Sequence, residues 1–472
     1  MNENNGRMSG SQKGGKFHRS FWTANLTELF ERSAYYAVAS FMVIYLGQLG
    51  LGEYWPSMLS SSVLWFLVYF LPILSGTIAD QVGFKKSLLV AFVLMAIGYF
   101  LVGTPVWFGN GELSPIIQND VTAGLGTIVL VVMGILLIGF GGSVIKPCVS
   151  GTVQKTSGKR ATLAFAIFYM TINIGSLLGR FISWFMRKQY DLSFIFAVGA
   201  GFCVIAFLVV LFLYSDPDDK DKLKNKVNQA RKSVGRILLD MVLVLKNPRF
   251  SLFLLVSSGF WFLYNQVYNI VPLYWKRVLE TDPAVDIYTT ANPFVIVFFQ
   301  LLITRFFGKL KPVRSIIIGN IIVGISMLVN LIPILLTNLR HEINISAWFL
   351  EFALPFGSVM GIATVGLIAF GELFSAARSY EYIGALAPKG KEGLFLGYAN
   401  LPVAIGALVS GWGGAVIFNE IMCRNSTKLP NGLLELDPFW NSMGWLILMT
   451  IGFLSATGMW LFNRWLEKQP AR

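Results

Sequence analysis

Three ionisable residues, Glu28, Glu31 and Arg32, stand inside a long apolar stretch near the start of the chain. Together with Tyr35 and Tyr36 they recur every three or four residues, so a helix would place all five on one face. If that helix crosses a bilayer, each unpaired charge would cost about 2.5–3.5 kcal/mol. We therefore expect these residues to pair or to line a wet interior, where they could transfer protons.

Two further charged residues interrupt apolar stretches. Lys146 precedes Pro147, and a helical proline frees a backbone carbonyl and opens space beside it. The alternative for Lys146 is that its amino group reaches the membrane surface. Glu372 lies midway between Pro355 and Pro388, so it is central in its span. A buried carboxyl group changes protonation with its surroundings, which makes Glu372 a candidate for proton coupling.

The composition is that of an integral membrane protein. Of 472 residues, 55% are hydrophobic and 13% are charged, and the mean hydropathy is +0.62, far outside the range of soluble globular proteins. Apolar stretches long enough to cross a core of about 30 Å recur along the chain. We expect twelve transmembrane helices, at residues 21–47, 55–79, 87–106, 125–151, 161–186, 192–214, 250–275, 288–308, 315–337, 352–386, 394–419 and 439–463.

The formal net charge of +13 reflects membrane topology rather than binding to nucleic acid. Lys and Arg are concentrated in the N-terminal tail, the even-numbered connections and the C-terminus. By the positive-inside rule, both termini are expected to be cytoplasmic. The expected location is the cell (inner or plasma) membrane, with lipid around the chain and protein partners unknown. Cys148, Cys203 and Cys423 are far apart, so neither a disulfide framework nor a metal site is expected.

The longest polar interruption, residues 215–246, divides the twelve spans into six and six. Within it, the apolar residues of 230–245 fall on one helical face, which predicts an amphipathic helix at the membrane surface. The expected domains are a cytoplasmic tail at 1–20, a six-helix bundle at 21–214, a cytoplasmic linker at 215–249, a second six-helix bundle at 250–465 and a cytoplasmic tail at 466–472.

The loop between the second and third spans resembles a signature of the major facilitator superfamily. It reads G-T-I-A-D-Q-V-G-F-K-K and is similar to the G-x-x-x-D-R-x-G-R-K motif, with Gln81 in place of the usual arginine. The residues that carry the resemblance are Gly76, Asp80, Gly83, Lys85 and Lys86, which we expect to form a loop that acts during conformational change. Two six-helix bundles with a central linker are also the architecture of that superfamily. We therefore expect an all-α membrane protein of the major facilitator fold, in which Asp80 caps the next helix or pairs with a basic neighbour.

Six segments together resemble the proton-coupled oligopeptide transporter family. E-L-F-E-R-S-A-Y-Y at 28–36 is similar to the family motif E-x-x-E-R-F-x-Y-Y, with Ser33 where phenylalanine is usual. The other segments are Y-F-L-P at 69–72, I-K-P at 145–147, F-Y-M-T-I-N-I-G-S-L at 168–177, N-P at 292–293 and G-E-L at 371–373. The resemblance extends over all twelve spans, and the combination is specific.

The resemblance implies roles for individual residues. Proton coupling would involve Glu28, Glu31, Arg32, Lys146 and Glu372, with Lys146 paired to Glu372 across the two bundles. The implied substrate-binding residues are Arg32, Tyr35, Tyr36, Tyr69, Lys146, Asn173, Asn265, Asn292 and Glu372. Cations would hold a cargo carboxylate, and a carboxylate with amides would hold its amino group, which suits a zwitterion. Protons would be the coupling ion, with no cofactor and no metal.

Three features depart from the family pattern. Asn265 stands where peptide transporters commonly place a carboxylate. Beyond Glu372, Arg378 and Glu381 are one helical turn apart, so they could pair locally or face the cargo cavity. Arg180, late in the fifth span, is expected at the extracellular rim.

These observations predict a proton-coupled symporter that imports di- or tripeptides or related small zwitterions by alternating access. One alternative is a similar symporter for a non-peptide anion or zwitterion, suggested by Asn265 and the altered tenth span. A non-transporting membrane sensor or a membrane enzyme is the other, but the chain contains no recognisable nucleophile and base pair or metal cluster. We therefore do not expect an enzyme.

Overall fold

The computed structural model describes residues 17–109, 112–157, 160–217, 235, 239, 243, 245–336, 338–347, 350–385 and 398–468. The predicted amphipathic helix of the linker, at 230–245, therefore lies largely outside the described residues. So do the N-terminal tail up to residue 16 and the last four residues of the chain.

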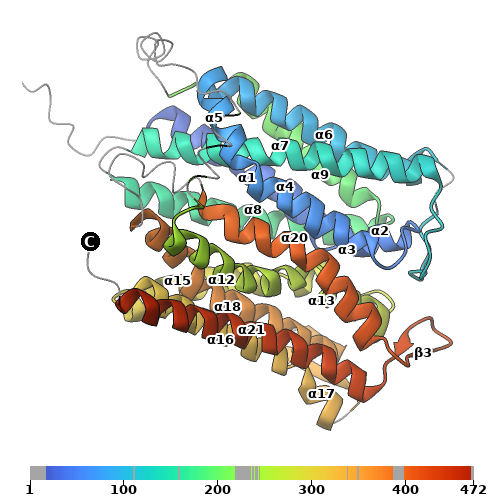
Figure 1. The fold of residues 1–472 in the computed structure, drawn as a ribbon. Coiled ribbons are helices and arrows are strands. Elements are labelled where there is room, and N and C mark those ends of the chain that lie inside the picture. Colours follow the sequence, from blue (N-terminus) through green and yellow to red (C-terminus); the bar gives the residue numbers. More distant parts are fainter. Residues whose placement is uncertain are drawn as a thin grey trace, which may run out of the picture.

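Helices from the first half of the chain lie together on one side of the molecule, drawn in blue to green in Figure 1. Helix α6 packs against α7 and α9, and α1 packs against α8 and α9. The elements of this half are α1 (Arg19–Ala39), α2 (Met42–Gln48), α3 (Trp55–Ser57), the π-helical segment η1 (Met58–Trp65), α4 (Phe66–Phe70), α5 (Pro72–Val82), α6 (Phe84–Trp107), α7 (Leu125–Ser157), α8 (Ala161–Gln189) and α9 (Phe194–Leu213).

Helices from the second half lie on the other side, drawn in yellow to red in Figure 1. Helix α16 packs against α18 and α21, and α12 packs against α20. The elements are α12 (Pro248–Asn265), η3 (Gln266–Tyr268), α13 (Ile270–Tyr274), η4 (Trp275–Leu279), α14 (Val285–Tyr288), α15 (Ala291–Phe307), α16 (Pro312–Leu328), α17 (Leu331–Leu336), β1 (Glu342–Ala347), β2 (Leu350–Pro355), α18 (Phe356–Ala385), η5 (Tyr398–Asn400), α20 (Leu401–Val416), η6 (Ile417–Met422), β3 (Thr427–Lys428), β4 (Leu434–Glu435) and α21 (Pro438–Glu467).

The molecule has two ends, here named the linker end and the far end. The linker end holds the start of α1, the turn at Gly83 and the start of α12. The far end holds α2, α3, β3 and the start of α7 (Figure 1). The halves meet where α20 packs against η1 and α4, and where α8 packs against α14 and α15.

Local sequence signals explain where several helices begin. Asn247 caps α12 by accepting a hydrogen bond from the backbone N–H of Arg249 at 3.1 Å, and Pro248 takes the first helical position. Asp437 and Pro438 start α21 in the same way. These pairs satisfy or remove the N–H groups that a helix start leaves unbonded.

Eleven helices among the described residues are long and apolar enough to cross a membrane. The first predicted span is absent from this set because α1 carries Glu28, Glu31 and Arg32, and because a turn at Ser40 separates it from α2. Helix α1 has 21 residues, which corresponds to about 31 Å. Its length therefore suits a bilayer, although its charges lower its hydropathy.

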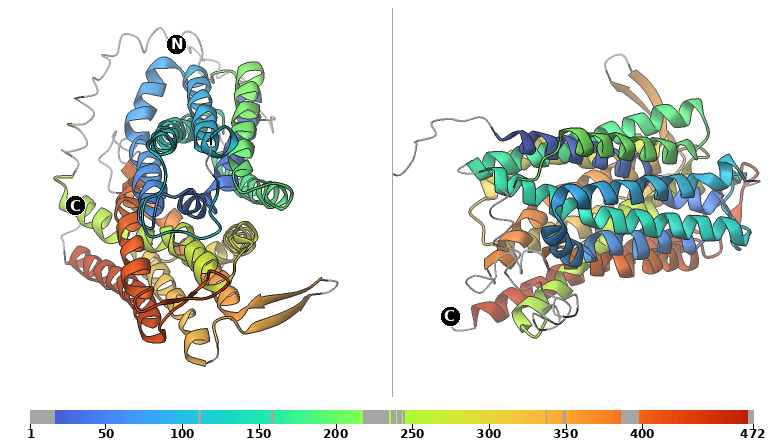
Figure 2. Two further views of the ribbon diagram at one scale, coloured as in Figure 1. Left: turned by 90° about the vertical axis from the view of Figure 1, so that its right-hand side faces the viewer. Right: turned by 90° about the horizontal axis from the view of Figure 1, so that it is seen from above.

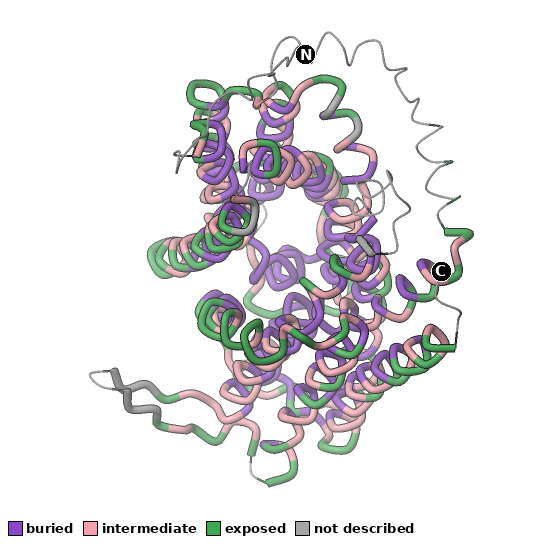
Figure 3. Tube along the Cα trace, turned by 90° about the vertical axis from the view of Figure 1, so that its left-hand side faces the viewer, coloured by how far each residue is buried: buried purple, intermediate pink, exposed green. Residues whose placement is uncertain are grey.

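Burial follows the division into two halves. In Figure 3 the buried parts of the helices turn towards the interior and the exposed parts turn outward. Large apolar side chains, among them Leu301, Phe306 and Leu335, are exposed on the outside. An outer surface of this kind suits contact with lipid tails, where no hydrophobic penalty applies.

The tenth predicted span, 352–386, begins too early. Residues 350–355 instead form strand β2, which pairs antiparallel with β1 so that Glu342 lies opposite Pro355. The hairpin projects sideways from the helices (Figure 2). Its apolar residues continue the hydropathy of α18 without a polar break, so the boundary between strand and helix was not visible in the composition.

Candidate cargo and proton site

Glu28, Glu31 and Arg32 are buried together on α1, with side chains from 1 to 7% exposed. Arg32 Nη2 donates to Oε1 of Glu31 at 2.6 Å, and Arg32 Nε donates to the other oxygen of Glu31. Arg32 Nε also lies 3.5 Å from Oε1 of Glu28. One cation thus faces two carboxylates, so the cluster favours the uptake of a proton or of another cation.

Two glycines bring α8 against this charged helix. A Cβ atom at Gly175 would lie 2.7 Å from the carbonyl oxygen of Leu29, and a Cβ atom at Gly179 would collide with that of Ser33. Ser33 occupies the contact from the other side, where its hydroxyl donates to the carbonyl oxygens of Leu29 at 2.8 Å and Gly175 at 3.2 Å. The small residue at position 33 therefore belongs to a close helix contact.

An aromatic cluster lies beside the charges and joins both halves. Trp65, the last residue of η1, has its ring centroid 5.2 Å from Tyr268, 5.4 Å from Tyr69 and 6.1 Å from Tyr35. Tyr35 and Tyr36 make an edge contact at 5.0 Å. Trp65 and Tyr268 were not among the residues predicted from the sequence; the position of Trp65 one helical turn before Tyr69 was the signal that could have indicated it.

Lys146 lies on α7 in the first half and Glu372 on α18 in the second half, and no ion pair between them is found among the described residues in this conformation. Nζ of Lys146 lies 5.2 Å from the centre of the Tyr69 ring. Glu372 lies beside Asn292 and Tyr264, within electrostatic range of Lys146. Both charged side chains are partly exposed, so each remains open to a ligand.

The three predicted asparagines are all buried, and two of them are bonded to their own helices. Nδ2 of Asn173 donates to the carbonyl oxygen of Tyr169, and Nδ2 of Asn265 donates to that of Trp261, both at 2.9 Å. Asn292 has no hydrogen-bond partner for its Nδ2 among the described residues. Asn292 therefore has both N–H donors available to a ligand, whereas Asn173 and Asn265 each use one N–H within their own helix.

Several buried polar atoms at the site where the two halves meet have no hydrogen-bond partner among the described residues. Most buried polar atoms in proteins have a hydrogen-bond partner, but a number of buried side-chain N and O atoms of the described residues have none. The exceptions at this site are both carboxylate oxygens of Glu28, the hydroxyl of Tyr35, Oδ1 of Asn265, Nδ2 of Asn292 and Oε2 of Glu372. Such a set, drawn from both halves, is suited to binding a small polar molecule.

Arg180 is fully buried, so its predicted position at the rim is wrong. Helix α8 continues nine residues past Arg180, to Gln189, which places the guanidinium about 14 Å inside the end of the helix. Its side chain is 0% exposed. The partners of its guanidinium are the hydroxyl of Thr289 at 3.0 Å, the hydroxyl of Tyr268 at 3.4 Å, the hydroxyl of Ser176 and the ring of Tyr36 at 4.5 Å.

Ion pairs hold the two halves together at the far end. Arg277 Nη2 lies 2.5 Å from Oε1 of Glu53. Arg187, in the last turn of α8, lies 2.6 Å from Asp282 and 3.6 Å from Asp286. Among the described residues, these are the ion pairs that cross between the halves. The structure therefore represents a state in which the far end is closed.

The loop predicted to act during conformational change is a tight turn at the linker end. Gly83 has φ of 101°, a conformation that favours glycine. The N–H of Lys85 donates to Oδ1 of Asp216 at 2.9 Å, so a carboxylate from the end of α9 caps α6. The side chain of Asp80 lies outside the described residues. Gly76 packs on Pro147, where an added Cβ atom would lie 3.2 Å from the proline Cβ, and Lys86 is exposed.

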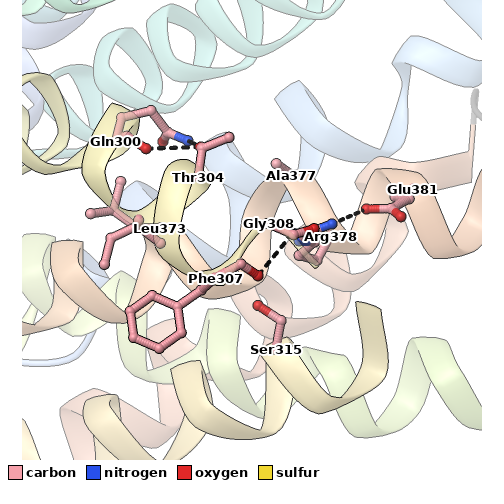
Figure 4. Close-up of a pocket in the computed structure, with 10 residues that line it drawn as sticks. Gln300, Thr304, Phe307, Gly308, Ser315, Leu373, Ala377, Arg378 and Glu381 are labelled. Atoms are coloured by element: carbon pink, nitrogen blue, oxygen red, sulfur yellow. Dashed lines mark hydrogen bonds and ion pairs between the residues drawn. The ribbon is translucent and has the colours of Figure 1, made fainter. Parts of the chain in front are cut away.

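Arg378 and Glu381 form the local pair that their spacing allowed, with Arg378 Nη1 2.6 Å from Oε2 of Glu381. Arg378 also donates to the carbonyl oxygens of Phe307 and Gly308 at the end of α15. Both residues line a cavity of about 230 Å³ between α15, α16 and α18 (Figure 4). Glu372 and Lys146 are not among its lining residues, so this pair supports the second half locally.

Known proteins resemble this chain in sequence and in fold. Dipeptide and tripeptide permease A of Cronobacter turicensis is 28% identical over 253 residues, a match that covers 52% of this chain and 44% of the permease. The chain thus spans less than half the length of that relative. Dipeptide and tripeptide permease A of Salmonella typhimurium is 24% identical over 451 residues, which cover 84% of this chain and 83% of the permease.

The fold comparison agrees with these matches. A crystal structure of peptide transporter POT in complex with sulfate has a TM-score of 0.70 at 17% identity, covering 97% of this chain and 96% of that one. The sequence model of the Major Facilitator Superfamily matches residues 21–411. The expected fold class and the resemblance to oligopeptide transporters are thereby confirmed, and the chain belongs to the Major Facilitator Superfamily.

Proposed function

We propose that this chain is a proton-coupled symporter that imports di- and tripeptides or related small zwitterions by alternating access. The observation that carries the proposal is the distribution of charge at the site. Arg32 and Lys146 come from the first half, and Glu372 comes from the second half beside Asn292. A zwitterionic cargo has separated charges of the complementary signs. The names of the two matched permeases support the same class of cargo.

In this mechanism the cargo carboxylate binds Arg32 and Lys146, and the cargo amino group binds Glu372 and Asn292. Tyr35, Tyr36 and Tyr69 line the space for the peptide backbone and side chains, together with Trp65 and Tyr268. Aromatic walls accept varied side chains because they offer a large apolar surface and do not require one particular hydrogen-bonding partner. The charged termini of the cargo are thus recognised by ionic contacts, while its side chains can vary.

Protons enter the cycle through the buried carboxyl groups. Protonation of Glu372, or of the pair Glu28 and Glu31, releases Lys146 and Arg32 for the cargo carboxylate. After the linker end opens, deprotonation restores the attraction between these carboxylates and the two cations, and the cargo leaves. The coupling ion is the proton, and the cycle uses no cofactor or metal.

The location of the carrier is part of the proposal. Both termini and the linker end face the cytoplasm, and the carrier lies in the cell membrane. The far end then faces outward, so the conformation described here, with its far-end ion pairs formed, is closed to the outside. Import requires that these pairs break and re-form once per cycle.

Uptake into proteoliposomes tests the function directly. Purified protein is reconstituted, a pH gradient (acid outside) is imposed, and uptake of labelled L-Ala-L-Ala is measured with and without the gradient. We expect uptake that depends on the gradient and is reduced by unlabelled di- and tripeptides. Gradient-driven uptake of another small zwitterion, with no competition from any di- or tripeptide, would favour a non-peptide symporter instead. Binding of peptide with no proton flux would indicate a sensor.

A further inference from the structure

Arg180 forms no ion pair with a carboxylate among the described residues, where hydroxyl groups are its hydrogen-bond partners. Arg32 is paired with Glu31, and Lys146 lies within electrostatic range of Glu372. Arg180 is nevertheless 0% exposed. A buried cation is costly unless an anion accompanies it, and a neutral residue of similar size would avoid this cost. The burial of Arg180 in α8 without a carboxylate partner therefore favours a role in binding an anion.

The partners of Arg180 show when an anion could reach it. Thr289 and Tyr268, which accept from its guanidinium at 3.0 and 3.4 Å, belong to the second half of the chain. When the halves separate at the far end, these two hydroxyls move away with their half. Arg180 then keeps only Ser176 and the ring of Tyr36 from its own half. The guanidinium would face the opening with free N–H donors and no neutralising charge.

The position of Arg180 on α8 relates it to the cargo. Asn173, a predicted cargo residue, precedes Arg180 by seven residues, so both lie on one face of the helix, about 10 Å apart along its axis. That separation equals about three extended residues at 3.3–3.6 Å each. Tyr36, which contacts the Arg180 guanidinium at 4.5 Å, also lies within electrostatic range of Arg32 and Glu372. Arg180 is therefore adjacent to the cargo site, on its far-end side.

We propose that Arg180 is a cargo-binding residue that captures a second anionic group of the cargo while the far end is open. The preferred cargo is then an acidic di- or tripeptide, in which one carboxylate meets Arg32 and Lys146 and the other meets Arg180. On closure, Thr289 and Tyr268 replace the anion as partners of Arg180, and the cargo moves towards Glu372. This inference rests on the proposed function and narrows its substrate class.

The first test compares cargoes on the unmodified protein. Uptake of L-Ala-L-Glu, L-Ala-L-Ala and L-Ala-L-Lys is measured in the same proteoliposomes under the same pH gradient. We expect the KM for the acidic peptide to be lower than that for the neutral one by about tenfold, the size of effect that one added charge-assisted contact gives. A KM for the acidic peptide equal to or above the neutral one overturns the inference but leaves peptide transport intact. Absence of uptake for all three overturns the proposed function, and this inference with it.

The second test removes the charge. Arg180→Gln should raise the KM for L-Ala-L-Glu by about tenfold and that for L-Ala-L-Ala by less than about threefold. Arg180→Lys keeps a cation and should retain part of the preference, although it lacks the bidentate geometry. Thr289→Val removes a hydroxyl partner without changing the charge, so the preference should remain. This third variant keeps the test informative if Arg180→Gln folds poorly.

Arg187→Gln is the matched control, because Arg187 lies on the same helix but has its own carboxylate partners, Asp282 and Asp286. It should change the uptake of acidic and neutral peptides by the same factor. If Arg180→Gln also changes both by the same factor, Arg180 acts only as a contact between the halves, and the inference is wrong.

Discussion

The two halves of the site differ in the charges that they contribute. The first half supplies three cations, Arg32, Lys146 and Arg180, whereas the second half supplies one carboxylate, Glu372, with Asn292 beside it. The first half also neutralises part of its own charge, since Arg32 pairs with Glu31 on the same helix. The second half has no such internal cation within reach of Glu372 among the described residues.

Under the proposed function, this asymmetry means that each half supplies only part of the cargo site. A zwitterion placed between them satisfies both, because its carboxylate meets cations and its amino group meets the carboxylate. The same arrangement makes cargo binding sensitive to protonation, because one carboxylate, Glu372, binds the cargo amino group and the cations of the first half cannot take its place.

The largest effect is expected from Glu372→Gln. Glutamine keeps the shape of the side chain, with one oxygen acceptor and an NH2 donor, but cannot exchange a proton. Gradient-driven uptake should fall by at least about tenfold, equivalent to about 1.4 kcal/mol, while exchange of labelled for unlabelled cargo without a gradient remains partly intact. Glu381→Gln, also on α18 but in the local pair with Arg378, is the control and should leave coupling unchanged. Unaltered gradient-driven uptake in Glu372→Gln would remove this residue from the mechanism.

The next effect comes from the cationic side of the comparison. Lys146→Gln should raise the KM for L-Ala-L-Ala by about tenfold, the loss expected for one charge-assisted contact. The variant should also discriminate less between this peptide and its C-terminal amide, which lacks the carboxylate. Lys155→Gln, on the same helix and over the ring of Phe84 at 4.2 Å, should leave both values unchanged. Undiminished discrimination in Lys146→Gln would assign the carboxylate to another residue.

A smaller effect is expected where the halves are held together. Arg277→Gln removes the far-end ion pair with Glu53, whose side chains are 10 and 13% exposed. A loss of about 1 kcal/mol would shift the balance towards the state open at the far end by about fivefold. Spin labels at Leu125 and Phe439, both exposed near the far end, would report longer distances by electron resonance, after replacement of Cys423 by serine.

The control for that experiment is Arg314→Gln. Arg314 pairs with Glu467 at 3.2 Å, but the pair lies within the second half and its side chains are 56 and 46% exposed. Exposed pairs of this kind contribute little, so the distance distribution should not change. An equal response in both variants would show that Arg277 and Glu53 are not a specific far-end contact.

The sequence predicted those features of the fold and site that depend on local patterns. Apolar stretches located the helices, and the spacing of Glu28, Glu31 and Arg32 placed them on one face, because both signals repeat within a few turns. Their ion pairing followed from the cost of burying charges. The pair of Arg378 and Glu381 was similarly available from an i, i+3 spacing.

Features that depend on where elements end, or on distant contacts, could not be read in this way. Arg180 was assigned to a rim because its span was expected to end near residue 186, whereas α8 extends to Gln189 and other elements cover its end. The contact of Arg277 with Glu53 joins residues more than 200 positions apart. Lys146 and Glu372 were expected to pair, but their distance depends on the conformation, which no local pattern specifies.

The smallest expected effect concerns the support of the second half rather than its charge. Arg378→Gln removes the pair with Glu381 and the hydrogen bonds to the carbonyl oxygens of Phe307 and Gly308, at 3.3 and 2.7 Å. These contacts satisfy the C-terminal end of α15, so the variant should lose about 1 kcal/mol of stability, seen as a lower Tm in detergent. Glu381→Gln removes only the pair, and should lower the Tm less. Because neither residue touches the site shared by the halves, the KM for peptide should be unchanged in both variants. A KM that is raised in Arg378→Gln alone would show that Arg378 contributes a cation to the site from the second half.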